Sequence, residues 1–299
     1  MSEPARVDQL LDAAMVAALD RLDVISRRQL RGTRDGERRS RRRGQGMEFA
    51  DFRPYSPGDD LRFVDWNIYG RMERLFLRIF LEEEDLSLMV AVDASASMAI
   101  GGKFLIAQRL AMALGYIGLV NQHRVTLAML KEDSCERLAG LRGRRKAAAA
   151  AAWLLQRQAQ GGLRFESASR AASQGRQGRG LAIVISDFLM REGMERGLQS
   201  WVGRGWDVIA LQVLAMEDIA PSTHGITGDL RLIDAEDASE TEVTISDALL
   251  RDHRDRLQAH NATLRGLCTR RGIRHIAIDT EVDLARLLLE TLRHGGILR

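Results

Sequence analysis

Small polar side chains follow two strongly apolar runs in this sequence. Asp93, Ser95 and Ser97 come directly after the first run, and Ser186 and Asp187 end the second. A carboxylate and two hydroxyls spaced two residues apart can point into one loop concavity at a strand end. Because such oxygen donors suit Mg²⁺ or Mn²⁺ better than Zn²⁺, the predicted metal ligands are Asp93, Ser95, Ser97 and Asp187.

The D-x-S-x-S pattern of Asp93, Ser95 and Ser97 has an alternative interpretation. It is short enough to occur by chance, and a strand that ends in the N-cap of the next helix would give the same residues. A phosphate-binding loop is excluded, because Lys103 would have to be followed by Ser or Thr where the chain has Phe104. We therefore expect no nucleotide hydrolysis by this chain.

A second group of residues that could do chemistry lies between positions 48 and 78, where arginines, aspartates and aromatic side chains alternate. They could form a catalytic acid cluster, a face that docks a partner, or an Arg–Asp network that ties this segment to the following domain. No nucleophile–base pair accompanies them, so the network is favoured and the docking face comes second. The candidate partner-binding residues are Arg53, Tyr55, Asp59, Asp60, Arg62, Asp65 and Trp66.

Histidines and cysteines give no sign of a transition-metal site. His253 and His260 lie seven residues apart on one side of an expected helix, without a third ligand, so we expect surface or packing roles. Cys135 and Cys268 have no CxxC motif. This excludes a disulfide framework or zinc module and fits a reducing cytoplasm.

Alternating strands and helices must position these residues from about residue 84 onward. Apolar runs at residues 86–92, 180–186 and 207–214 are typical of strands buried on both faces. The alternation predicts a doubly wound α/β domain with a mainly parallel sheet. The other expected elements are strands at 125–130 and 273–278, a hairpin at 230–233 and 242–245, and helices at 7–25, 104–120, 146–157, 192–202, 247–271 and 283–293.

The 299 residues are expected to form three parts: an N-terminal helix and arginine-rich strip at 1–43, a turn-rich layer at 44–83 packed on the main domain, and the α/β domain at 84–299. The strip has nine arginines against two acids, whereas the whole chain has a net charge of only +3. It is most simply a solvated strip; nucleic acid, anionic lipid or an acidic protein are the alternatives. No apolar run reaches the roughly 18–20 residues of a membrane span and no signal peptide is recognisable, so we expect a cytoplasmic protein.

Two motifs resemble known families. Asp93, Ser95 and Ser97 resemble the first part of the metal-ion-dependent adhesion site of von Willebrand factor A domains. The block at residues 48–71 resembles the signature of the bacterial domain-of-unknown-function family fifty-eight, and matches continue to the C-terminus, Lys103 among them. This resemblance implies a von Willebrand A-like fold and an association with MoxR-type AAA+ ATPases.

One position departs from the adhesion-site pattern. In A domains that bind metal, a threonine after a Gly-Gly turn supplies a further ligand, but here Leu163 follows Gly161-Gly162. We therefore expect weak Mg²⁺ or Mn²⁺ binding that strengthens when a partner carboxylate fills an open position. The resemblance implies a non-enzymatic interaction module that works with a MoxR-type AAA+ ATPase on an unknown client. The alternatives are a metal-dependent hydrolase with Asp187 as base, and a nucleic-acid binder, for which the strip lacks stacking aromatics.

Overall fold

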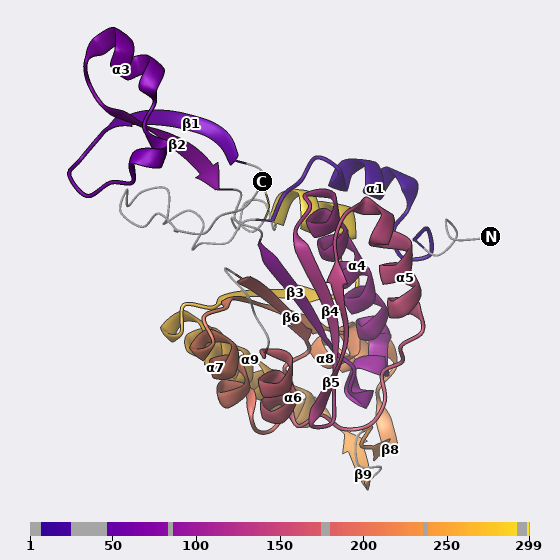
Figure 1. Cartoon of the computed structure of the whole chain (residues 1–299). Coiled ribbons are helices and arrows are strands. Elements are labelled where there is room, and N and C mark those ends of the chain that lie inside the picture. The colour runs from indigo at the N-terminus through magenta and orange to yellow at the C-terminus, as the bar shows by residue number, and fades with distance from the viewer. Residues whose placement is uncertain are drawn as a thin grey trace. The chain divides into compact units, whose positions relative to one another are not determined.

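A computed structural model describes residues 7–24, 47–82, 86–174, 180–235, 239–291 and 298. The chain forms two compact units. The larger unit combines Met1–Arg34 with Leu86–Arg299, and the smaller one is Asp35–Asp85 (Figure 1). The predicted arginine strip lies outside the described residues.

The smaller unit is built on a β-hairpin that the sequence analysis did not predict. Strand β1 (Met47–Pro54) pairs antiparallel with β2 (Phe76–Glu82). A 3₁₀ turn, η2 (Leu61–Phe63), and a short helix, α3 (Trp66–Met72), connect the two strands. Pro57 and Gly58 in this connection are typical turn residues, in agreement with the turn-rich layer expected at residues 44–83.

The larger unit is organised around a six-stranded sheet with the order β10-β7-β6-β3-β4-β5. Five strands run parallel, and only β5 pairs antiparallel, with β4. Almost every residue of the three central strands is buried, because helices cover both faces, and this explains their unbroken apolar runs. The prediction of a doubly wound, mainly parallel sheet is confirmed. The bounds are β3 (Ser87–Asp93), β4 (Arg124–Lys131), β5 (Ser134–Leu141), β6 (Gly180–Ser186), β7 (Asp207–Leu214) and β10 (Arg274–Asp279).

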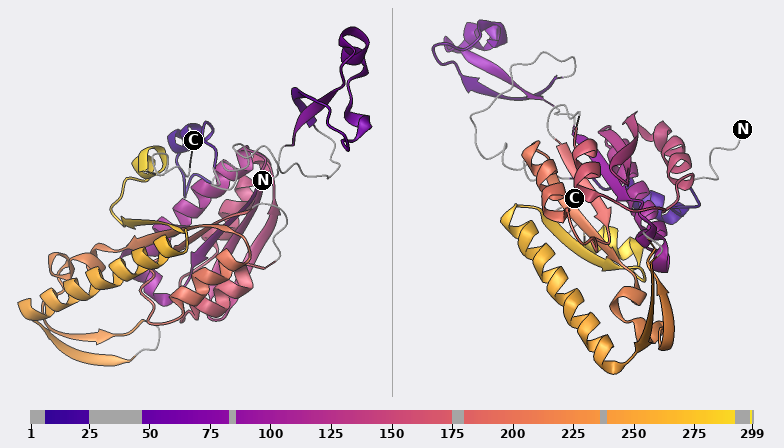
Figure 2. Two further views of the ribbon diagram at one scale, coloured as in Figure 1. Left: turned by 90° about the vertical axis from the view of Figure 1, so that its left-hand side faces the viewer. Right: turned by 90° about the horizontal axis from the view of Figure 1, so that it is seen from below.

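Helices cover the sheet on its two faces, each over its own apolar core (Figures 1 and 2). The first face carries α1 (Ala13–Leu19), α4 (Lys103–Val120), α5 (Ala147–Leu155) and α10 (Leu284–Arg286), which continues as the π-helical turn η6 (Leu287–Thr291). The second face carries α6 (Phe165–Ala172), α7 (Met194–Gly203) and α9 (Asp247–Arg270). Short pieces complete the unit: η3 (Ala96–Gly102), η4 (Arg144–Lys146), α8 (Met216–Ile219), η5 (Pro221–His224) and the hairpin β8 (Gly228–Ile233) with β9 (Glu240–Ile245).

Helix α4 is apolar on all sides and runs through the first core. With the preceding turn it forms one segment, Ala96–Val120, that is long and apolar enough to cross a membrane. Within the fold 83% of its apolar window is buried, and a core helix passes the same test of length and composition.

The helix in the N-terminal segment of the larger unit is shorter than expected. A helix was predicted over residues 7–25, but α1 begins after its N-cap Asp12 and ends at Leu19. The chain turns after α1, and side chains that follow α4 hold the next residues: Asn121 donates to the carbonyl oxygen of Leu22 at 2.7 Å, and His123 contacts Asp23 at 2.9 Å. These contacts replace the helical hydrogen bonds that the periodicity predicted.

Candidate functional site

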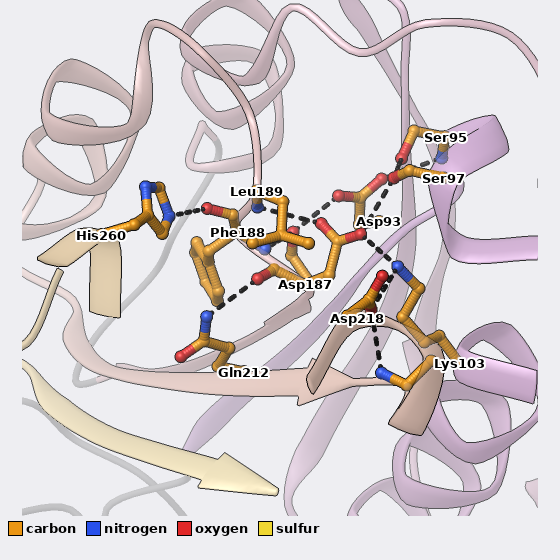
Figure 3. Close-up of polar contacts among 12 residues, drawn as sticks. Asp93, Ser95, Ser97, Lys103, Asp187, Phe188, Leu189, Gln212, Asp218 and His260 are labelled. Atoms are coloured by element: carbon orange, nitrogen blue, oxygen red, sulfur yellow. Dashed lines mark hydrogen bonds and ion pairs between the residues drawn. The ribbon is translucent and has the colours of Figure 1, made fainter. Parts of the chain in front are cut away.

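The carboxyl ends of neighbouring strands bring the predicted metal ligands together. Strand β3 pairs with β6 in parallel, with Val92 opposite Ile185, so the residue that ends β3 and the residue that follows β6 lie at the same end of the sheet. Asp93 and Asp187 are these residues, and their side chains lie in one cluster with those of Ser95 and Ser97 (Figure 3). We call this cluster of four residues the cup.

Asp93 is the buried floor of the cup. Its carboxylate accepts hydrogen bonds from the backbone N–H of Ser95 at 2.8 Å and from the Ser186 hydroxyl at 2.6 Å. Burial, together with the negative charge of Asp187, raises the pKa of Asp93 to about 6, against the opposing effect of the serine hydrogen bonds. The surroundings of Asp93 are therefore short of positive charge.

The two serine hydroxyls of the cup are not used to cap a helix. Ser95 occupies the N-cap position of η3, yet its side chain makes no capping hydrogen bond there. Its Oγ lies 3.1 Å from Oγ of Ser97, which in turn donates to Oδ2 of Asp187 at 3.0 Å. The other oxygen of Asp187 accepts from the backbone N–H of Leu189. The capping interpretation of this pattern does not account for its hydroxyls.

Lys103 completes the cluster, and the sequence analysis gave it no role. Its side chain is 1% exposed, and its ammonium lies 2.8 Å from Oδ2 of Asp187 and 3.0 Å from Oδ2 of Asp218 (Figure 3). Although burial alone lowers the pKa of Lys103, the charges and hydrogen bonds of the two aspartates raise it above the usual lysine value. The available signal was a lysine at the start of a largely apolar helix, but Asp218 is far away in the sequence and no local pattern pairs the two.

A close approach between Gly101 and Ala215 fixes the turn that precedes Lys103. Gly101 has φ of +60°, and a Cβ at this position would lie only 2.3 Å from Cβ of Ala215, at the start of α8. The carboxylate of Asp218 in α8 accepts a hydrogen bond from the backbone N–H of Ala215 at 2.9 Å. The backbone carbonyl oxygen of Asp218 accepts one from the His253 side chain of α9 at 2.7 Å. The loops after β3 and β7 are therefore held against each other beside the cup.

Helix α9 also supports the loop that follows β6. His260 donates to the carbonyl oxygen of Phe188 at 2.6 Å (Figure 3). The side-chain amide of Gln212 donates to the carbonyl oxygen of Asp187 at 3.0 Å and lies 2.9 Å from Oδ1 of Asn261. The α9 histidines therefore have packing roles, as their sequence context predicted, and the backbone that they hold is that of the site.

The cup opens into a groove of about 1410 Å³. The Gly-Gly turn before Leu163 lies next to the cup, since the carbonyl oxygen of Gly161 accepts the N–H of Ala96 at 2.8 Å. Leu163 lines the groove and offers no donor oxygen. Charged residues are frequent along the rest of the wall: Glu132, Arg164, Glu166, Arg191, Glu192, Glu195, Arg196 and Asp234.

The donor set of the cup fits a weakly held divalent cation. Among the described residues, no group of three or more His, Cys, Asp or Glu side chains has a metal-binding arrangement. The cup instead combines two carboxylates with two neutral hydroxyls. Counting Asp218 and Lys103, the cluster has three carboxylates and one ammonium, so negative charge is in excess. This excess, and the raised pKa of Asp93, are what a cation would relieve.

The charged candidates of the smaller unit are engaged within that unit. Arg53 forms an ion pair with Asp59, and Arg62 forms one with Asp60. Asp65 is buried and caps α3 by accepting two backbone N–H groups. These contacts have the ion-pair chemistry of the predicted network, but each joins near neighbours in the sequence.

The aromatic candidates of the smaller unit differ in exposure. Trp66 is 59% exposed and packs edge to face with Tyr69, while Tyr55 is half-buried. Several apolar side chains around α3 are exposed with it. This exposed set, which we call the α3 face, comprises Leu61, Phe63, Trp66, Tyr69 and Met72.

Comparisons with known proteins agree with the resemblance found in the sequence. The family model described as "Protein of unknown function DUF58" matches residues 51–263. The "Uncharacterized protein Rv1480" of Mycobacterium tuberculosis and the "Uncharacterized protein Mb1516" of Mycobacterium bovis are each 29% identical over 266 residues, which cover 85% of this chain and 83% of each relative.

Similar solved structures include the SpRpn10 VWA domain. It aligns with a TM-score of 0.40 and 13% identity over 69% of this chain and 94% of that domain. An aerotolerance-related membrane protein from Bacteroides fragilis NCTC 9343 aligns with a TM-score of 0.40 and 16% identity over 71% of this chain and 98% of that one.

Proposed function

The chain belongs to the family described as Protein of unknown function DUF58, and that description assigns no activity. From the site itself we propose a non-enzymatic module that holds a divalent cation in the cup and, through this cation, binds an acidic side chain of a partner protein. The observation that carries this proposal is the excess negative charge of the cup beneath neutral serine hydroxyls, at the floor of an open groove.

Mg²⁺ or Mn²⁺ is the proposed cofactor of the cup. Ser95 and Ser97 would hold the cation, with Asp93 and Asp187 behind them. A cation held mainly by neutral hydroxyls keeps its electrophilicity, so it supplies a position for an external carboxylate. The groove has room for a protruding side chain of a partner to reach the cup.

The contacts of the cup support binding over hydrolysis. A hydrolase would need a general base beside the cation, and Asp187 is the obvious candidate. Both of its oxygens already accept hydrogen bonds, and one also faces the Lys103 ammonium. A carboxylate whose oxygens are held by these three donors is poorly placed to take a proton from a water beside the cation.

For the partner, we propose a MoxR-type AAA+ ATPase or its client protein, in the cytoplasm. The support is the family membership and the α3 face, whose exposed Trp66 and Tyr69 are the kind of side chains that dominate protein interfaces. The two cysteines are free thiols, which fits a reducing compartment.

Calorimetric titration with Mn²⁺ tests the cation. We expect weak binding by the natural chain and loss of binding in Ser97→Ala, whereas Ser134→Ala, at an exposed position on β5, should bind as the natural chain does. Equal heats from all three proteins would show that the cup holds no cation.

Binding of the purified MoxR-type ATPase from the source genome tests the partner. The complex should form in Mg²⁺, dissociate in EDTA and weaken in Asp93→Ala. Trp66→Ala should weaken the complex without changing Mn²⁺ binding. A complex that is indifferent to EDTA but dissolves steeply with salt would instead indicate a contact through the arginine strip.

A further inference from the structure

Lys103 occupies a position that the helix around it does not favour. It is the first residue of α4, where the helix dipole disfavours a positive charge. Its side chain is also 1% exposed in a helix whose neighbours are apolar. A lysine here costs helix stability and desolvation, so its role must be sought in what the ammonium contacts.

The ammonium contacts two carboxylates that come from different loops. Asp187 follows β6, and Asp218 lies in α8 after β7. Asp93 faces the same cluster from the end of β3. Three carboxylates against one ammonium leave two negative charges, which one divalent cation would neutralise.

We propose that Lys103 is a built-in counter-cation that limits the affinity of the cup for divalent metal, so that the metal is held firmly only together with a partner carboxylate. This inference rests on the proposed function. Lys103 stabilises the aspartates while no metal is bound and repels a metal that enters the cup. Replacing the ammonium with a neutral group should leave three uncompensated negative charges.

Four proteins that differ in the charge of the cluster test this role. The natural chain and Lys103→Met/Asp218→Asn have two excess negative charges, Lys103→Met has three, and Asp218→Asn has one. We expect Mn²⁺ affinity, by calorimetry, to follow that charge: highest in Lys103→Met, equal in the natural chain and the double variant, and lowest in Asp218→Asn. Each step should be about tenfold or more at an effective dielectric constant of about 20.

Thermal unfolding gives a second readout. Without metal, Lys103→Met should melt below the natural chain, because its carboxylates repel one another. Saturating Mn²⁺ should raise its melting temperature more than that of the natural chain, since tighter binding stabilises the folded state more. Lys103→Arg keeps the charge and should bind Mn²⁺ like the natural chain.

The outcomes separate this inference from the proposed function. If the natural chain binds Mn²⁺ and folded Lys103→Met binds it no better, the counter-cation role is wrong and the cation site stands. If no variant binds Mn²⁺, both are wrong. If Lys103→Met does not fold, Asp218→Asn decides: unchanged Mn²⁺ affinity in that variant overturns the inference.

Discussion

At the scale of single residues, the site combines groups that burial makes costly. Asp93 is the clearest case, since its pKa lies well above that of an ordinary aspartate. A carboxylate that is buried beside another negative charge and ionised at neutral pH lowers the stability of the protein without bound metal. Functional sites commonly carry costs of this kind, which the rest of the fold offsets.

Asp93→Asn should therefore change how stability depends on pH. Between about pH 4 and pH 6 the folded protein holds a proton on Asp93 that the unfolded chain has lost, so the natural chain loses stability as pH rises through this window. The loss should be on the order of 2 to 3 kcal/mol, and the variant, which has no carboxyl group to titrate there, should not show it. Urea unfolding of both proteins at pH 4.5 and pH 7.5 measures the difference; identical slopes with pH would contradict the prediction.

Leu163→Thr should add a donor to the cup. Its hydroxyl would stand where metal-binding A domains have a threonine, so we expect Mn²⁺ affinity to rise several-fold. Leu163→Val has the shape of threonine without the oxygen and is the matched control. If both variants change calorimetric Mn²⁺ binding alike, the effect comes from packing and not from a ligand.

At the scale of elements, apolar runs predicted the central strands of the sheet well, but they did not predict the edge strand β5, the short helix α6 or the hairpin β1–β2. Strands β6 and β7 have the predicted bounds because burial on both faces makes every residue apolar. Strand β5 was missed, since it has polar and apolar residues mixed on an exposed sheet edge. Helix α6 was missed because its eight residues are half polar. The hairpin β1–β2 was hidden by the long connection between its strands.

The same distinction holds for the site. Asp93 and Asp187 could be predicted, because each directly follows a recognisable strand and parallel neighbours end at one edge. Lys103, Asp218 and the supporting contacts of α9 could not. They depend on how loops that are far apart in the sequence pack together, and the periodicity of apolar residues carries no information about that packing.

Gly101→Ala should disrupt the contact between the loop after β3 and helix α8, beside the cup. The added Cβ would lie 2.3 Å from Cβ of Ala215, so the loop after β3 must move away from α8, and we expect a loss of about 2 kcal/mol or more. Gly102→Ala is the control. Gly102 also has positive φ, but nothing lies near its missing Cβ, so only the backbone cost of about 1 kcal/mol applies. Equal losses in urea unfolding would mean that the close approach is unimportant.

At the scale of the whole molecule, the N-terminal segment belongs to the core of the larger unit. Leu10, Leu11 and Leu19 are buried in the same apolar cluster as α4, although a long stretch of sequence separates them from that helix. Such long-range packing means that the N-terminal segment and the sheet should unfold together.

Leu19→Ala tests this cooperativity. Removing a fully buried leucine should lower the free energy of unfolding of the larger unit by about 2 to 4 kcal/mol, whereas Val16→Ala, at a half-buried position, should cost about 1 kcal/mol. Tryptophan fluorescence reports the unfolding, because Trp201 and Trp206 lie in the opposite core. If the sheet of Leu19→Ala unfolds at the same urea concentration as that of the natural chain, the N-terminal segment unfolds separately from the sheet.

The antiparallel strand β5 has a consequence for how the protein behaves when concentrated. It is the last strand on its side of the sheet, and an exposed edge invites strands from other molecules. Here Glu136 pairs with Lys131, and Arg137 donates to the carbonyl oxygens of Ala171 and Gln174 beside the edge. An added strand would have to bury these charges, so the edge resists the open-ended stacking that leads to fibres.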